Sequence, residues 1–161
     1  TPESAEVRVD ALLACSRLTV SAVACTVTNR ACSMQTILVV DDSPTIRRMV
    51  RTALGTLADV TSAEAGSGLQ AIETLAVQPV QAVVLDLNMP DMHGLDVLKF
   101  LRSHQQYRSV PVMILTTRGD ETSREAALEA GATAYMTKPF SPSALASSVK
   151  TLLAESSLRP S

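Results

Sequence analysis

Short apolar runs alternate along this chain with longer stretches in which apolar residues recur every three or four positions. The short runs predict buried strands, and the longer stretches predict helices with one apolar face. The strands are expected at residues 36–40, 60–63, 82–87, 110–116 and 132–137. The helices are expected from residue 44 to about 57, from 69 to near 79, from 95 to 103, from 121 to 130 and from 142 to about 155. This succession of strand–helix units predicts a single doubly wound α/β domain, in which a parallel sheet carries helices on both faces.

Residues at the expected helix ends agree with this pattern. Ser43-Pro44 and Ser141-Pro142 each place an N-cap serine before a proline at the first helical position. Gly131 follows the fourth expected helix, where a glycine commonly ends a helix. We therefore expect the folded domain at residues 34–156 and a short tail at residues 157–161.

Residues 1–33 have a different composition, rich in Ala, Ser, Thr, Val and Cys, without a sustained helical or strand period. They contain all three cysteines, whose spacing matches no metal or redox motif. The apolar stretch around Arg17 is too short for a membrane span. Residues 18–27 have the length of a secretory h-region, so export is an alternative, although the acidic start of the chain argues against it. We expect residues 1–33 to be a poorly ordered extension. One explanation for such an extension is translation that begins upstream of a natural start at Met34.

The composition limits the classes of function. The formal net charge is −2, and the chain has no Trp, two Tyr and two Phe. The composition therefore provides neither a positive net charge nor many aromatic side chains for stacking on bases, and it does not favour nucleic-acid binding. We expect a cytoplasmic protein that binds neither nucleic acid nor membrane, so its chemistry must come from a local site.

Polar residues stand at the ends of the expected strands: Asp41-Asp42, Asp86, Thr116 and Lys138. Parallel strands share one carboxyl edge, where such sheets bind ligands, so these groups should meet in one crevice. Two carboxylates ~4 Å apart repel by about 4 kcal/mol at an effective dielectric near 20. Carboxylates in excess over one lysine favour a hard cation, and Mg²⁺ suits a site made of carboxylates, a carbonyl, water and a phosphate oxygen. Thr116 and Lys138 would then contact a phosphoryl group.

Asp86 is the candidate nucleophile of this site. An aspartate carboxylate can accept a phosphoryl group and form an aspartyl-phosphate. Asp86 stands alone at the end of the central strand, whereas Asp41 and Asp42 form a pair better suited to the metal.

With these motifs, residues 34 to about 154 closely resemble the receiver domain of two-component response regulators, particularly the stand-alone chemotaxis type. The resemblance rests on Asp41-Asp42, Asp86 in "LDLNMPDMHG", Thr116 and Lys138-Pro139-Phe140. The spacing is 44 residues from Asp42 to Asp86, then 30 to Thr116 and 22 to Lys138. The resemblance implies a flavodoxin-like sheet with strand order 2-1-3-4-5 and five helices.

The resemblance also implies how the site would work. Asp86 would accept the phosphoryl group from a phosphohistidine of a histidine kinase. Asp42, Asp86 and the backbone carbonyl of Asn88 would bind Mg²⁺, and Asp41 would act largely through water. The chain would be a signalling phosphoacceptor rather than an enzyme, and it would lose the phosphoryl group by autodephosphorylation.

The same resemblance implies a switch and its partners. Thr116 and Lys138 would bind phosphoryl oxygens, and Tyr135 would be the switch aromatic that turns inward as the threonine moves. The output face would be residues 120–154, and the first helix would be the kinase docking side. Because only "SSLRPS" follows the last helix, we expect output through a separate protein, a flagellar-motor switch component or a phosphorelay protein.

Thr117 and Arg118 depart from the family pattern, in which many relatives carry a small residue and then an acidic or other polar one. Arg118, with Asn88 across the site, would lie near the path of the attacking water. We expect altered self-dephosphorylation, in a direction that the sequence does not determine.

Two alternatives compete with this interpretation. A Mg²⁺-dependent aspartate-nucleophile phosphatase uses the same kind of sheet, but its motif has a second aspartate where Asn88 stands here, and no cap domain fits in this length. The segment from Gly66 matches the dinucleotide pattern G-x-G-x-x-A, although the short polar strand before it favours a simple turn. His93 and His104 lack the spacing of a metal pair, and we assign them no role.

Overall fold

Five parallel strands form one sheet in the order β2-β1-β3-β4-β5 in the computed structural model, which describes residues 34–156. The strands are β1 (Gln35–Val40), β2 (Val60–Ala65), β3 (Ala82–Leu85), β4 (Val112–Thr116) and β5 (Ala134–Thr137). The helices are α1 (Pro44–Leu54), α2 (Gly68–Val77), α3 (Gly94–Ser103), α4 (Glu121–Glu129) and α5 (Pro142–Ser156). The predicted doubly wound fold and its strand order are confirmed. The expected extension (1–33) and tail (157–161) lie outside the described residues.

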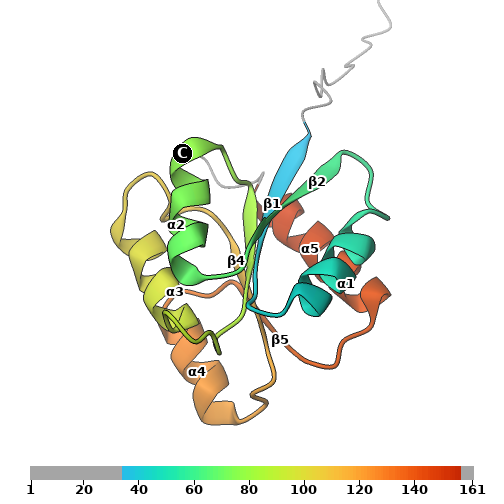
Figure 1. The fold of residues 1–161 in the computed structure, drawn as a ribbon. Helices are drawn as coiled ribbons and strands as arrows, with labels where there is room; N and C mark the ends of the chain where they lie inside the picture. The colour runs from blue at the N-terminus through green and yellow to red at the C-terminus, as the bar shows by residue number, and fades with distance from the viewer. Residues whose placement is uncertain (1–33, 157–161) are drawn as a thin grey trace, which may run out of the picture. The chain divides into compact units, whose positions relative to one another are not determined.

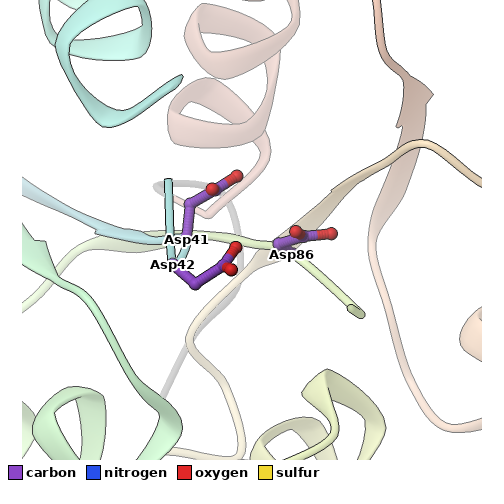
Figure 2. Close-up of side chains that lie close together, drawn as sticks. All are labelled: Asp41, Asp42 and Asp86. Carbon is purple, nitrogen blue, oxygen red and sulfur yellow. The ribbon is translucent and has the colours of Figure 1, made fainter. Parts of the chain in front are cut away.

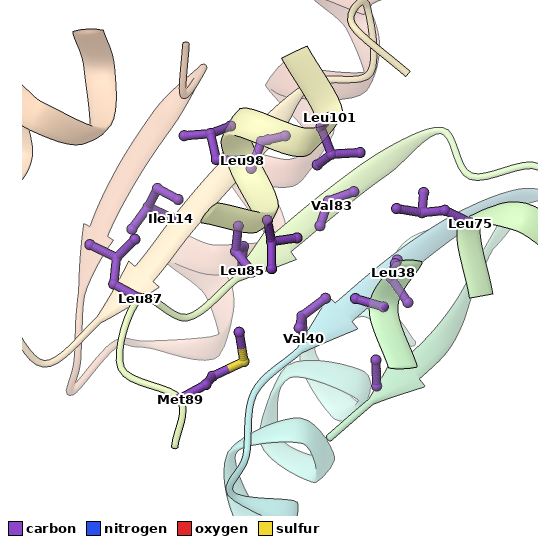
Figure 3. Close-up of a cluster of buried hydrophobic side chains, with 14 of the residues drawn as sticks. Leu38, Val40, Leu75, Val83, Leu85, Leu87, Met89, Leu98, Leu101 and Ile114 are labelled. Atoms are coloured by element: carbon purple, nitrogen blue, oxygen red, sulfur yellow. The ribbon is translucent and has the colours of Figure 1, made fainter. Parts of the chain in front are cut away.

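Each face of the sheet carries its own hydrophobic core (Figure 1). Helices α2, α3 and α4 cover one face, and α1 and α5 cover the other. Strand β1 contributes to both cores, since Leu38 and Val40 pack on the side of α2 and α3 (Figure 3), while Ile37 and Val39 pack against α1 and α5. All four side chains are at most 1% exposed. This burial on both faces explains why β1 is a continuous apolar run.

Three strands are shorter than the apolar pattern predicted. β3 ends at residue 85 rather than 87, β4 begins at 112 rather than 110, and β5 begins at 134 rather than 132. Leu87 shows the reason, because it is 2% exposed although it lies in the loop after β3. An apolar pattern reports burial, whereas the pairing of backbone groups with the neighbouring strand sets the strand ends.

The edge strand β2 is longer than the predicted 60–63, because it pairs with the whole of β1 from Gln35↔Val60 to Val40↔Ala65. α1 ends at residue 54 rather than about 57. The Thr56 and Leu57 amides donate to carbonyls only three residues back, in a tighter turn. The other element ends agree with prediction within two residues.

The predicted helix ends are confirmed. The Ser43 and Ser141 hydroxyls accept hydrogen bonds from backbone amides three residues on, at the N-termini of α1 and α5. Gly131 has a φ of +100° after α4, which a residue with a side chain rarely adopts. The Gly131 and Ala132 amides bond back to Leu128 and Ala127, so the glycine closes the helix as a Schellman motif.

Within residues 34–156, no helix combines the length and the apolar character needed to cross a bilayer.

Candidate functional site

The carboxylates of Asp41, Asp42 and Asp86 lie together at the carboxyl edge of the sheet (Figure 2). Asp41 and Asp42 follow β1, and Asp86 follows β3. One oxygen of each residue lies within 4.8 Å of an oxygen of the other two. The sheet sets this separation, because the Asp86 amide donates to the Val40 carbonyl at 2.9 Å. Three oxygens in this arrangement are suitable ligands for a hard divalent cation.

The Lys138 ammonium group bridges two of the carboxylates. Its Nζ donates to Asp41 Oδ2 at 2.5 Å and to Asp86 Oδ2 at 3.1 Å. These three side chains are at most 10% exposed, so their charges interact more strongly than at a protein surface. Because three carboxylates face one ammonium group, the cluster keeps a net negative charge that favours cation binding.

The two neighbouring aspartates have different environments. Asp41 Oδ1 accepts the Ser43 amide at 2.8 Å, and Oδ2 accepts Lys138, so both oxygens of Asp41 have protein partners. Burial raises the pKa of the Asp41 carboxyl above its ordinary 3.8, although the hydrogen bonds from Lys138 and Ser43 oppose that rise. Asp42 is exposed, and its carboxylate makes no hydrogen bond or ion pair within residues 34–156. Asp42 is therefore the more available of the two as a direct ligand.

Arg47 on α1 holds the loop that carries both aspartates, and sequence reasoning did not identify it. Its Nη1 donates to the Asp41 carbonyl at 2.7 Å and to the Asp42 carbonyl at 3.4 Å. Its Nε pairs with Glu64 of β2 at 3.2 Å. The only signal in the sequence is a basic residue one turn into the helix. That signal does not reveal the contacts of Arg47 with the loop, because every residue has a backbone carbonyl and the sequence does not show which one an arginine reaches.

Gly94 shapes the loop after β3, and its importance was also missed. A Cβ atom at Gly94 would lie 2.1 Å from the Asp86 carbonyl oxygen and 2.7 Å from Leu87 Cα. Its amide donates to the Leu87 carbonyl at 3.0 Å, which fixes the start of α3 against this loop. Only glycine permits that approach. The final residue of "LDLNMPDMHG" therefore helps to position Asp86.

Thr116 and Tyr135 are linked through the backbone of Arg118. Thr116 is fully buried, and its Oγ1 accepts the Arg118 amide at 3.3 Å. The Tyr135 hydroxyl donates to the Arg118 carbonyl at 2.5 Å. Burial raises the pKa of the Tyr135 phenol above its ordinary 10.0. The Asn88 side chain joins this group, because its Nδ2 donates to Thr116 Oγ1 at 3.2 Å.

A cavity of about 580 Å³ opens beside the carboxylates. Its lining combines Asp42, Asp86, Asn88 and Lys138 with apolar side chains of α1 and of the loop before α5, which are Ile46, Met49 and Phe140. Met49 is 41% exposed. The charged site therefore has an apolar wall that solvent and a partner can reach.

The structure brings the predicted aspartates, Asn88, Thr116 and Lys138 to this edge of the sheet, and Tyr135 lies within β5 with its hydroxyl bonded to the Arg118 carbonyl. The two histidines have other positions: His93 caps α3 by accepting the Leu95 amide at 3.3 Å, and the His104 ring lies 4.0 Å from the Phe100 ring. A Cβ atom at Gly68 would lie 2.8 Å from Met92 Cβ. Close packing therefore explains this glycine without a nucleotide.

Comparison with known proteins identifies the family of this chain. A family model described as the response regulator receiver domain matches residues 37–150. The chain belongs to the response regulator receiver family. This receiver domain is 37% identical over 118 residues to the chemotaxis protein CheY1 of Helicobacter pylori, a match that covers 73% of this chain and 95% of that protein. It is 41% identical over 107 residues to the transcriptional regulatory protein KdpE of Mycobacterium tuberculosis, covering 66% of this chain and 46% of that protein.

Solved structures agree with the sequence relatives. The chemotaxis response regulator CheY4 of Vibrio cholerae matches this receiver domain with a TM-score of 0.70 and 31% identity, covering 75% of this chain and 100% of that one. Receiver domains are signalling phosphoacceptors, they bind Mg²⁺ in general, and they interact with histidine kinases and downstream targets. The comparisons give no support to the alternative phosphatase function.

Proposed function

We propose that Asp86 accepts a phosphoryl group from the phosphohistidine of a histidine kinase. A carboxylate oxygen of Asp86 forms the new P–O bond while the P–N bond breaks, and the electron pair of that bond returns to the histidine nitrogen. The observation that carries the proposal is the convergence of Asp86 with two further carboxylates and the Lys138 ammonium group at one strand edge.

Mg²⁺ fits this site for two reasons. Three carboxylate oxygens lie within 4.8 Å of one another, and the negative charge of the three carboxylates exceeds the positive charge that Lys138 supplies. We assign Asp42, Asp86 and the backbone carbonyl of Asn88 as its ligands, with Asp41 acting through water. When bound, the ion neutralises charge that builds up on the transferred group. Lys138 and Thr116 would contact the phosphoryl oxygens, and Lys138 is already positioned against Asp86.

The proposed output passes from Thr116 to Tyr135 and to the surface of α4, β5 and α5. The hydrogen bonds from the Arg118 amide to Thr116 Oγ1 and from the Tyr135 hydroxyl to the Arg118 carbonyl support this route. The output partner would be a flagellar-motor switch component or a phosphorelay protein, in the cytoplasm. The kinase would approach on the side of α1, where the cavity and its apolar wall open.

The test is Mg²⁺-dependent phosphorylation from acetyl phosphate, followed by intact mass. We expect one phosphoryl group per chain in the wild type and none in Asp86→Asn. Asp91→Asn is the matched control, because Asp91 is an exposed aspartate in the same loop. Equal labelling of Asp86→Asn would overturn the assignment, and rapid turnover of many phosphomonoesters would instead favour a phosphatase.

Autodephosphorylation is the last part of the proposal. Arg118 is exposed beside the Thr116 side of the site, and we propose that its charge alters the rate at which water hydrolyses the Asp86 phosphate. Replacement by glutamate reverses that charge. An unchanged decay rate in Arg118→Glu contradicts this role.

A further inference from the structure

The Asn88 side-chain amide spans two hydroxyl groups at the end of β4. Its Nδ2 donates to Thr116 Oγ1 and to Thr117 Oγ1, each at 3.2 Å. One amide nitrogen carries two hydrogens, so both bonds can exist at once. Thr116 is fully buried, whereas Thr117 is exposed and lines the cavity beside Asp86. Thr117 therefore acts as an outer anchor for an amide whose other hydrogen reaches the switch threonine.

This arrangement restrains the Thr116 side chain. Its Oγ1 accepts from Asn88 Nδ2 and also from the Arg118 amide at 3.3 Å, which occupies both lone pairs of the oxygen. A displacement of Oγ1 that moves it away from both donors would lengthen these bonds. A neutral hydrogen bond of this kind shifts a two-state equilibrium by about threefold to tenfold.

The restraint extends to the output side. The Arg118 carbonyl accepts the Tyr135 hydroxyl at 2.5 Å, so the segment from Thr116 to Arg118 is held at one end by Asn88 and at the other by Tyr135. We propose that the Asn88 amide, anchored on the Thr117 hydroxyl, is a latch that holds the switch in its resting conformation. Thr117 is thus a positioning residue that sets the fraction of unphosphorylated protein in the active conformation. This inference rests on the proposed function of Asp86 and Thr116.

The test compares Thr117→Val, which keeps the shape but loses the hydroxyl, with Thr117→Ser, which keeps the hydroxyl. Fluorotyrosine replaces both tyrosines of the chain, and ¹⁹F NMR spectra are recorded with Mg²⁺ and no phosphodonor. Tyr107 is an internal reference, because its hydroxyl donates to the Leu75 carbonyl at the end of α2, away from the site. A spectrum of the wild type after acetyl phosphate treatment defines the active position of the Tyr135 signal.

We expect Thr117→Val to move the Tyr135 signal toward the active position, with the active fraction raised about threefold to tenfold. Thr117→Ser should match the wild type, and the Tyr107 signal should stay in place in both variants. A Tyr135 signal that does not move in Thr117→Val, or that moves equally in both variants, overturns the latch.

Intact mass of the same samples separates this inference from the proposed function. If the wild type gains no phosphoryl group, the proposed function fails and the latch fails with it. If the wild type is phosphorylated and its Tyr135 signal moves, but Thr117→Val stays at the resting position, only the latch is wrong.

Discussion

Lys138 Nζ lies 3.1 Å from Asp86 Oδ2, which joins residues 52 positions apart in the sequence. The same ammonium group contacts Asp41, so one cation compensates two carboxylates that are almost inaccessible to solvent. This relationship means that the residues proposed to bind a phosphoryl group also hold the unphosphorylated site together. Each side chain of the cluster therefore affects stability as well as chemistry.

Replacing Lys138 with methionine should destabilise the metal-free protein. The substitution leaves two buried carboxylates without their cation, and breaking such a pair costs about 3 kcal/mol. Urea unfolding at neutral pH in EDTA measures the loss, and Mg²⁺ should restore part of it by supplying charge at the same place. Lys150→Met is the matched control, because Lys150 is an exposed lysine on α5. Equal stability of the two variants would show that the Lys138 ion pairs contribute nothing.

Magnesium should raise the melting temperature of the wild type. Binding to the folded state at ten times the dissociation constant adds about 1.4 kcal/mol, or roughly 3–6 °C. Asp42→Asn should lose most of this shift, because the Asp42 carboxylate has no protein partner within residues 34–156 and is the side chain most available to the ion. Asp91→Asn should keep it. Differential scanning calorimetry decides the point, and a full Mg²⁺ shift in Asp42→Asn would mean that the ion binds elsewhere.

The metal-free protein should show a pH dependence that comes from Asp41. Burial raises the folded-state pKa of Asp41 above 3.8, so the folded state holds this proton more tightly than the unfolded state does. The contribution of Asp41 to stability is therefore greatest when it is protonated, and it falls as the pH rises from 3.8 through the folded-state pKa.

Asp41→Asn removes this titration. The stability of the variant relative to wild type should rise across that pH range, as measured by urea unfolding in EDTA. Subtracting the wild-type curve cancels the other titrating groups, and Asp91→Asn should give a flat difference. A difference that is flat for Asp41→Asn, or that falls with pH, contradicts the raised pKa.

Gly94→Ala should destabilise the protein and impair phosphorylation together. The new methyl group would lie 2.1 Å from the Asp86 carbonyl oxygen, so the loop has to move, at a cost of about 3 kcal/mol. Gly55→Ala is the control, because Gly55 has a helical φ of −62° and the nearest atom to its Cβ lies 3.4 Å away. That variant should gain about 0.4–1 kcal/mol. Urea unfolding and acetyl phosphate labelling test both, and full labelling of a stable Gly94→Ala protein would refute the packing argument.

The sequence alone was sufficient for the fold class and for predicting which polar residues meet at the carboxyl edge of the sheet. The interior strand β1 is apolar on both faces, which predicts a buried parallel strand without reference to its neighbours. Ser43, Ser141 and Gly131 define their helix ends through local backbone chemistry, and the structure confirms them. Asp86 was predicted to meet the aspartates that follow β1 because parallel strands share one carboxyl edge, and that reasoning needs only the order of the elements.

The tertiary structure decided the contacts that depend on atoms brought together from distant segments. The polar strand β2 extends to Ala65 because β1 supplies hydrogen-bond partners along its whole length, which its own residues do not reveal. Arg47 donates to the backbone carbonyl of Asp41, and Gly94 is required because the backbone of Asp86 leaves no room for a Cβ atom. The Asn88 amide bridges two hydroxyl groups, one on β4 and one on the residue after it. Local patterns record burial and backbone preference, whereas these contacts arise from distances that exist only after the strands have paired. For this reason the sequence determined which groups meet at the edge of the sheet, and only the folded structure determined which atoms hold one another there.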